Sequence, residues 1–208
     1  VSTAKIVDDA VTAAKINNDI ISGSTELATE PADTDEFLVS DAGTLKRIDY
    51  SLIKGGGITQ ADQWRLTANI TGTNALISSN LSQVSGAVVG TGMSVSSGIF
   101  TFPETGVYLV IVNLEWQLIE NSDNVFIAGL LTTDNSSYSN FVRPGFSNKM
   151  GSNTADGITS SQFGFVDITN TSTHKVKFET QSMAGSTIFA GDANSNKTTF
   201  SFIRLGDT

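Results

Sequence analysis

Cysteine is absent from the sequence, and histidine occurs only once, as His174. Without cysteine the chain forms no disulfide and offers no thiolate for catalysis or for a metal ion. A single histidine also nearly excludes His-based metal centres and nucleophilic triads. We therefore expect no resident metal or cofactor, and a role other than that of an enzyme.

Charged residues are scarce as well, at 16% of the chain, and acidic residues outnumber basic ones to give a formal net charge of −9. An acidic chain without a Lys/Arg cluster repels phosphate backbones, so we expect no nucleic-acid partner. No stretch approaches the roughly 20 apolar residues of a membrane-spanning helix, so we expect no membrane insertion. The sequence begins at Val1, and Asp8 and Asp9 interrupt any early apolar run. We expect a fragment or a processed chain without a signal peptide.

Gly, Ser, Thr and Asn are abundant between short apolar stretches. This mixture is typical of an all-β domain in which short strands are joined by many turns, and it predicts no long helix. Outside the central motif described next, the predicted strands are 64–70, 81–89, 125–131, 163–168, 175–179, 186–191 and 198–205.

The strongest local pattern reads Gly98-x-Phe100-x-Phe102-Pro103-x-x-Gly106-x-Tyr108. Phe100 and Phe102 are two residues apart and therefore point to one face of an extended strand. The residues from Pro103 to Gly106 supply turn chemistry, because proline presets φ and glycine tolerates positive φ. The strand that follows places Tyr108 and every second residue up to Leu118 on one apolar face.

The opposite face of that strand changes character along its length. Val107, Leu109 and Ile111 are apolar, whereas the alternate residues from Asn113 to Gln117 are polar. A strand that is apolar on both sides is covered on both sides. We therefore predict that Val107, Leu109 and Ile111 contact a partner beyond the core of their own domain.

The motif from Gly98 to Tyr108 resembles the signature of the C1q/TNF-like jelly roll, in which strand, turn and strand carry Gly, Phe, Pro, Gly and Tyr at this spacing. The carboxyl end, Thr199–Leu205, resembles the Phe-rich closing strand of that family. The resemblance covers residues 62–208 and implies a sandwich that assembles as a homotrimer. It places Val107, Leu109 and Ile111 in the trimer interface.

Residues 1–21 contain a short repeat, in which Ala4-Lys5-Ile6 recurs as Ala14-Lys15-Ile16. So short a unit cannot bury its own Ile and Val side chains. One interpretation is an amphipathic helix or a flexible leader. The other is the end of a shaft wound from three chains, because the segment resembles shaft repeats of bacteriophage fibre proteins.

Residues 22–57 form a second segment. Glu36–Ser40 and Leu45–Tyr50 flank Asp41-Ala-Gly-Thr44, which predicts a β-hairpin, and Gly55-Gly-Gly57 is a strong linker signal. The hairpin sequence resembles an element common in phage tail and fibre proteins. An isolated hairpin is marginal in water, so we expect it to add to a neighbouring chain or to cap the base of the trimer. The jelly roll then occupies residues 58–208, which we call the knob.

The segment from Asp134 to Gly157 is rich in Ser, Asn and Gly and is too long for a tight hairpin. Long loops in compact domains are usually binding loops or disordered. Aromatic and Arg side chains on such an adaptable backbone are typical of binding surfaces. We predict that the receptor contact uses Tyr138, Phe141, Arg143 and Phe146. The alternative is that some of these rings pack in the trimer interface or in the core of the loop.

The acidic residues show no pair whose spacing forces two carboxylates onto one strand face, as hydrolysis of a glycosidic bond requires. Asp192 with Asn194, and Asp123 with Asn121, could supply oxygen ligands to Ca²⁺. Asp, Asn and Gly also make turns, which is the interpretation we prefer. His174 follows a turn and is expected on the surface.

These observations predict a bacteriophage tail or head fibre protein, a homotrimer whose knob binds a host-surface receptor, expected to be a glycan. The amino-terminal end would join other virion proteins, and the protein would act extracellularly as part of the virion. One alternative is a fragment of a polysaccharide-degrading tailspike, but such an enzyme needs paired carboxylates and a long repetitive β-helix. Another is an extracellular C1q/TNF-like binding module, against which the shaft-like repeat, the lack of cysteine and the lack of a signal peptide count.

Overall fold

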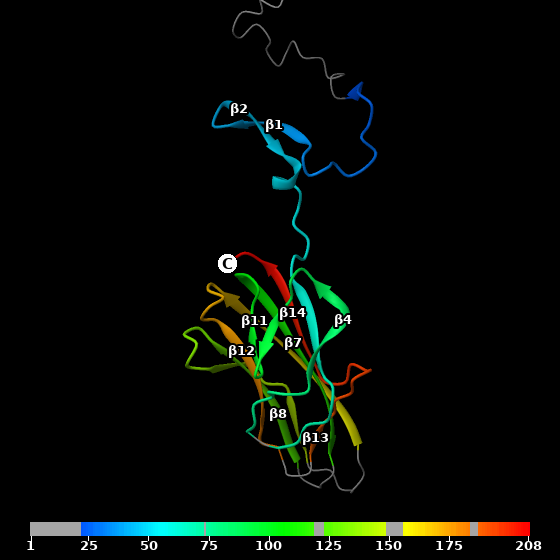
Figure 1. The fold of residues 1–208 in the computed structure, drawn as a ribbon, viewed down its shortest axis with the longest axis vertical. Helices are drawn as coiled ribbons and strands as arrows, with labels where there is room; N and C mark the ends of the chain where they lie inside the picture. Colours follow the sequence, from blue (N-terminus) through cyan, green and yellow to red (C-terminus); the bar gives the residue numbers. More distant parts are fainter. Residues whose placement is uncertain (1–21, 73, 119–122, 149–155, 184–186) are drawn as a thin grey trace, which may run out of the picture. The chain divides into compact units, whose positions relative to one another are not determined.

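The computed structural model describes residues 22–72, 74–118, 123–148, 156–183 and 187–208 (Figure 1). The predicted shaft repeat, residues 1–21, lies outside the described residues. The chain divides into two compact units between Gly55 and Gly56. This division falls within the Gly55–Gly57 run that marks the linker in the sequence.

The first unit contains the predicted hairpin. Strands β1 (Glu36–Asp41) and β2 (Thr44–Asp49) pair antiparallel, with Asp41 opposite Thr44. The two turn residues, Ala42 and Gly43, have φ of 49° and 84°, and positive φ at both positions suits the twist of a two-residue hairpin. Among the side chains of this unit Leu38 and Leu45 are 74% and 70% exposed. The hairpin therefore leaves apolar surface that its own two strands cannot cover.

The second unit is a sandwich of two antiparallel sheets (Figure 1). One sheet, which we call the β7 sheet, has the order β11 (Asp156–Ile168), β7 (Gly106–Leu118), β14 (Thr199–Gly206), β3 (Ala61–Leu66) and β4 (Leu81–Val89), with β13 (Ile188–Phe189) also pairing with β7. The other, the β8 sheet, has the order β10 (Gly145–Asn148), β8 (Asp123–Thr132), β12 (Lys175–Gln181), β6 (Ile99–Thr101) and β5 (Ser94–Ser96), with β9 (Ser139–Val142) also pairing with β8. Most neighbours in each sheet are far apart in sequence, so the fold depends on long-range pairing.

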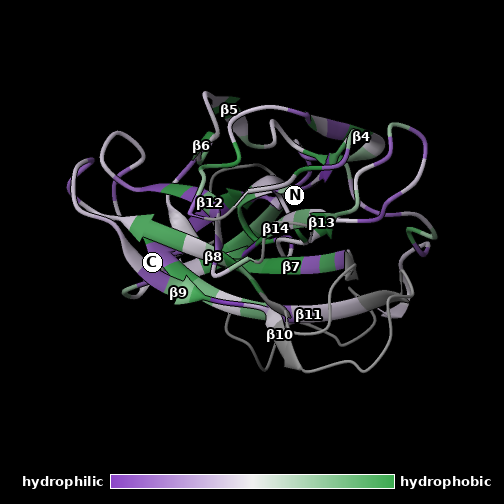
Figure 2. Ribbon diagram, turned by 90° about the horizontal axis from the view of Figure 1, so that it is seen from below, coloured by the Kyte–Doolittle hydropathy of each residue, from purple (hydrophilic) through white to green (hydrophobic). Residues whose placement is uncertain are grey.

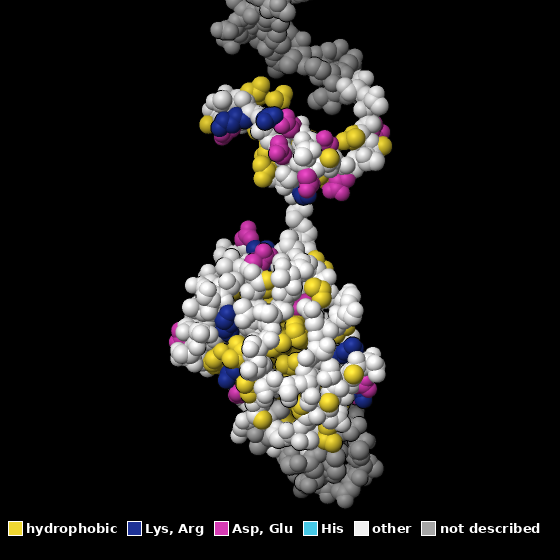
Figure 3. Space-filling view, viewed as in Figure 1, with side chains coloured by type: hydrophobic (Ala, Val, Ile, Leu, Met, Phe, Trp, Pro, Cys, Tyr) yellow, Lys and Arg dark blue, Asp and Glu magenta, His cyan; other side chains and the backbone are white. Residues whose placement is uncertain are grey.

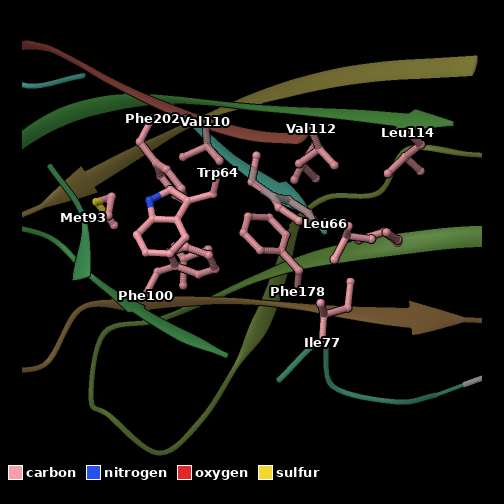
Figure 4. Close-up of a cluster of buried hydrophobic side chains, with 14 of the residues drawn as sticks. Trp64, Leu66, Ile77, Met93, Phe100, Val110, Val112, Leu114, Phe178 and Phe202 are labelled. Atoms are coloured by element: carbon pink, nitrogen blue, oxygen red, sulfur yellow. The ribbon is translucent and has the colours of Figure 1, made fainter. Parts of the chain in front are cut away.

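The core lies between the two sheets, where aromatic side chains pack among Leu, Ile, Val and Met (Figure 4). Alternate residues of β3 and β12 are buried, as expected for strands with one face in a core. Trp64 meets Phe100 edge-on at 5.4 Å between ring centroids, and Phe178 stacks on Phe200 at 4.2 Å. Each of these contacts joins a strand of one sheet to a strand of the other, so the rings hold the two sheets together.

The two glycines of the central motif meet steric demands that no other residue satisfies. Gly98 has φ of 78°, and a Cβ there would lie 2.3 Å from the carbonyl oxygen of Ile77. Gly106 has φ of 142°, and a Cβ there would lie 2.5 Å from the carbonyl oxygen of Gly206. The backbone where β6 and β7 begin therefore requires glycine at these two positions of the motif.

Tyr108 completes the motif from the core side of β7. Its ring is 4.7 Å from that of Phe102, and its hydroxyl donates a hydrogen bond of 3.0 Å to the carbonyl oxygen of Glu104. Burial raises the pKa of Tyr108 to about 12. The side chain thus ties the turn at 103–106 to the core, and the predicted burial of Phe100, Phe102 and Tyr108 is confirmed.

Several predicted strands are confirmed, and others need correction. The strand predicted at 163–168 is the end of β11, which begins at Asp156, and within 186–191 the described strand is only Ile188–Phe189. Strand β4 occupies residues 81–89 as predicted, whereas the first strand of the knob is 61–66 rather than 64–70. Beyond its end, Ile70 forms an isolated bridge with Phe189. The predicted loop from Asp134 to Gly157 contains strands β9 and β10 and the start of β11. Both β9 and β10 pair with β8, so a segment rich in turn-forming residues joins the sheet edge through its backbone.

Candidate interaction surfaces

The outward side of the β7 sheet carries an apolar patch, which we call the apolar face. Leu109 of β7 lies opposite Phe165 of β11 and Ile203 of β14, and Ile111 lies opposite Phe163. Phe163 and Phe165 are 65% and 61% exposed, and their rings meet edge-on with centroids 6.1 Å apart. Adjacent exposed apolar side chains of this size commonly mark an interaction site.

Val107, Leu109 and Ile111, the residues predicted for a trimer interface, are half-buried on this outward side. Their assignment to a trimer interface stays a prediction. Sequence reasoning missed Phe163 and Phe165, although the alternation Phe163-Gly164-Phe165 places both rings on one side of a strand. The missing information was that β11 pairs with β7 in a register that puts these rings beside Leu109 and Ile111.

The same side of the sheet becomes polar further along β7. Nδ2 of Asn113 donates a 3.2 Å hydrogen bond to the hydroxyl of Thr199, and Glu115 lies 3.9 Å from the Nζ of Lys197. The change from Ile111 to Asn113 is therefore a boundary between apolar and polar surface. It limits the apolar face to one half of the sheet.

The four predicted receptor-contact residues are not brought together on one loop. Phe141 of β9 is half-buried and packs against the core. Its ring lies over Gly164, where a Cβ would come within 2.9 Å of it, and near Gly129. Phe146 lies in β10 opposite Val125, and its side chain is outside the described residues. Phe141 thus supports the alternative that some of these rings have a packing role.

An open cleft of about 540 Å³ lies beside Phe141, lined by residues 140–143 and 161–163. Strands β9, β10 and β11 run close together along this edge of the sandwich (Figure 2). The backbone N–H of Arg143 donates a 3.1 Å hydrogen bond across the cleft region to Oε1 of Gln162. Phe163 contributes both to this cleft and to the apolar face, so the two surfaces are continuous.

Tyr138 and Arg143 lie on the outward side of the β8 sheet. Arg143 contacts β8 and β12, and Tyr138 contacts β12. The guanidinium carbon of Arg143 is 4.0 Å from the centre of the Phe126 ring, and Nε donates a 2.9 Å hydrogen bond to Gln181. The Nζ of Lys177 is 4.4 Å from the centre of the Tyr138 ring. In Figure 3, Lys and Arg atoms lie beside hydrophobic atoms on the part of the knob where Figure 1 labels β12.

The turn before Tyr138 is organised by one carboxylate. Oδ1 of Asp134 accepts hydrogen bonds from the backbone N–H groups of Ser136 and Ser137, at 2.9 and 2.7 Å, and from the hydroxyl of Thr132. The N–H groups of Ser137 and Ser136 hold the pKa of Asp134 well below its usual range. Asp134 therefore fixes the start of the segment that carries Tyr138.

His174 was expected on the surface, and this prediction is wrong, since its side chain is buried. Its ring nitrogens lie 3.1 Å from the hydroxyl of Thr173 and 3.3 Å from that of Thr169. The turn at 170–173 folds back so that Thr169 before it and Thr173 at its end both contact the ring. His174 can be buried beside this turn because both ring nitrogens have hydroxyl partners.

The structure also bears on metal binding and membrane insertion. In the described ranges, no group of three or more His, Asp or Glu side chains lies close enough to hold a metal ion. Oδ1 of Asp192 accepts hydrogen bonds from the N–H groups of Asn194 and Ser195, which is turn geometry. Asn121 lies outside the described residues. Over the same described ranges, no helix has the length and apolar character needed to cross a bilayer.

The two antiparallel sheets and their strand order define the class of the second unit. It has the C1q/TNF-like jelly-roll fold, as the sequence resemblance implies. Among solved structures, the chain is similar to Eiger, a TNF from S. frugiperda, with a TM-score of 0.58, 11% identity, and coverage of 73% of this chain and 96% of Eiger. Murine APRIL at pH 5.0 gives a TM-score of 0.51 and 10% identity over 70% of this chain and 98% of APRIL. The sequence matches no family model and no curated protein. Identities this low establish a shared fold and nothing finer.

Proposed function

We propose that the chain is the distal part of a bacteriophage tail or head fibre, whose knob forms a homotrimer and binds a glycan on the host surface. The observation that carries this proposal is the apolar face. Phe163 and Phe165 are more than half exposed on β11, beside the half-buried Leu109 and Ile111 of the neighbouring strand β7. Such a strip is stable in water when another copy of the chain covers it.

In a closed ring of copies, each apolar face is covered by a neighbouring copy, and no uncovered face remains to bind further copies. The resemblance of the Gly98–Tyr108 motif to C1q/TNF-like proteins favours three copies. Three identical receptor sites on one trimer would act together, so that a weak individual site could still give firm attachment.

The assignment to a virion depends on the first 57 residues. The repeat of Ala-Lys-Ile resembles a fibre shaft, and the hairpin resembles an element of phage tail and fibre proteins. In this proposal the amino-terminal end joins other virion proteins and the knob is the outermost, extracellular part. We propose no enzymatic activity; the lining of the cleft beside Phe141 includes no carboxylate.

Two measurements test the proposal. Light scattering on the full chain should give about three times its 21.9 kDa mass. Fluorescently labelled protein should then bind intact bacteria of a strain panel in a saturable manner, and unlabelled protein should compete. A stable monomer, or a trimer that binds no bacterium in a broad panel, would contradict the proposal.

An extracellular C1q/TNF-like binding module is the second candidate, favoured by the fold that the knob shares with Eiger. The same labelled protein distinguishes the two. Saturable binding to cultured animal cells, with none to bacteria, would support the module and not the fibre.

A further inference from the structure

Among the cations that the structure describes in the knob, Arg143 has no carboxylate partner; Arg65 and Lys175 lack one too, but Nη1 of Arg65 donates to Asn196 and Nζ of Lys175 donates to the carbonyl oxygen of Thr171. Lys177, Lys197 and Arg204 each form an ion pair, with Glu179, Glu115 and Glu104 respectively. No ion pair involves Arg143 within the described ranges, and its side chain is exposed to solvent.

Exposed arginines usually sample many rotamers, but the side chain of Arg143 is held by two contacts and its backbone by a third. Its guanidinium stacks at 4.0 Å on Phe126, its Nε donates to Oε1 of Gln181, and its backbone N–H donates to Gln162. Holding a long side chain in one orientation costs conformational entropy. A fixed group that is left without a counter-charge is ready to bind one from outside.

The residue that holds Nε is itself oriented by a chain of contacts along β12. Nε2 of Gln181 donates a 3.1 Å hydrogen bond to Glu179, so its carbonyl oxygen faces Arg143. The other carboxylate oxygen of Glu179 lies 3.7 Å from Nζ of Lys177, which in turn sits over Tyr138. Residues 177, 179 and 181 share one face of the strand, so this network joins Arg143 to Tyr138.

Nε bonds Gln181, whereas within the described residues no hydrogen bond involves the two terminal nitrogens of this exposed guanidinium. That end of an arginine matches the two oxygens of a carboxylate. The net charge of −9 repels densely charged polyanions, whereas a single cation in an acidic protein suits an isolated negative charge. A carboxylate on a polysaccharide of moderate charge density is such a group.

We propose that Arg143 binds the carboxylate of an acidic sugar, and that Gln181, Glu179, Lys177 and Tyr138 are positioning residues that orient its guanidinium. This inference deepens the proposed attachment function, on which it rests, by naming the chemical class of the glycan and the residues that select it. In this inference Tyr138 does not touch the sugar; it supports the residues that orient Arg143.

The probe for the test is methyl galacturonide, a sugar with a single carboxylate, with its methyl ester as the matched neutral sugar, and binding to the full chain is measured by calorimetry. The unmodified chain should bind the acid and not the ester. Arg143→Gln should weaken binding about tenfold to a hundredfold, the expected loss for a hydrogen bond to a charged group. Arg143→Lys should restore part of the binding, because it keeps the charge but not the planar fork.

Two further variants distinguish the effect of a charge placed at the Arg143 guanidinium from the effect of the net charge of the chain. Gln181→Glu places a carboxylate on Nε, so it should abolish binding without lowering the melting temperature. Lys175→Gln removes one positive charge from the same strand and should change binding less than twofold. Equal losses in Lys175→Gln and Arg143→Gln, binding of the methyl ester, or binding of dextran sulfate in place of the uronate would overturn the inference.

Cell adsorption distinguishes this inference from the proposed function. If the unmodified chain and Arg143→Gln adsorb equally to bacteria, the inference fails and the attachment function stands. If the unmodified chain adsorbs to no bacterium, the attachment function itself fails.

Discussion

Replacing Phe165 with Asp removes an apolar ring from the centre of the apolar face and adds a charge there. The ring is 61% exposed in the isolated chain. A Phe side chain covers roughly 200 Å², so about 120 Å² of this ring is available for burial against another copy. At about 25 cal/mol per Å² this burial contributes at most about 3 kcal/mol per copy, or about 9 kcal/mol over a trimer. A loss of that size weakens trimer association about a millionfold.

The fold of each knob should survive this change, because Phe165 lies outside the aromatic core between the sheets. Light scattering at micromolar concentration should show a monomer for Phe165→Asp, with a far-UV circular dichroism spectrum like that of the unmodified protein. Leu76→Asp is the matched control, since Leu76 is 38% exposed but lies in a segment that bridges to Glu179 of the other sheet. A trimer that persists in Phe165→Asp would refute the assignment of this face, and so would dissociation of the Leu76→Asp control.

Three more predictions concern stability. Residues 58–208 expressed alone should melt cooperatively and form the same oligomer as the full chain, because the chain divides at the Gly55–Gly57 run; aggregation of this fragment alone would place the hairpin in the core. Gly98→Ala should lower the free energy of unfolding by about 2 kcal/mol or more, since it adds a strained positive φ and a clash with Ile77, whereas Gly56→Ala, which meets no atom within 4 Å, should be near neutral in the same denaturant titration. Asp134→Ala should be destabilising at pH 7, and because the folded pKa of Asp134 is depressed, its benefit is present above the ordinary value of 3.8 and is lost as pH falls through the folded pKa; a difference in melting temperature that stays constant down to pH 2 would contradict this.

Local sequence patterns predict several parts of the chain. Alternation predicts that Phe100, Phe102 and Tyr108 face one core, and they do, because the two-residue period of a strand is a local property of the backbone. Turn residues predict the β1–β2 hairpin, because positive φ is set by the residues of the turn themselves. The Gly98–Tyr108 motif also indicates the C1q/TNF-like fold, since its glycines meet constraints that the fold imposes on the backbone.

The candidate sites depend on contacts between segments far apart in the chain. Nothing near Arg143 in the sequence indicates that Gln181 will hold its guanidinium, and Phe165 is more than fifty residues from Leu109. Phe141, predicted to contact a receptor, turns toward Gly164 because β9 runs beside β11. The sequence by itself determined the β1–β2 hairpin, strand β4 and the alternation of β7, because these depend on local patterns. Which side chains meet was decided only by the pairing of β7 with β11 and of β8 with β12, since burial of one face in the core fixes the register of each pair.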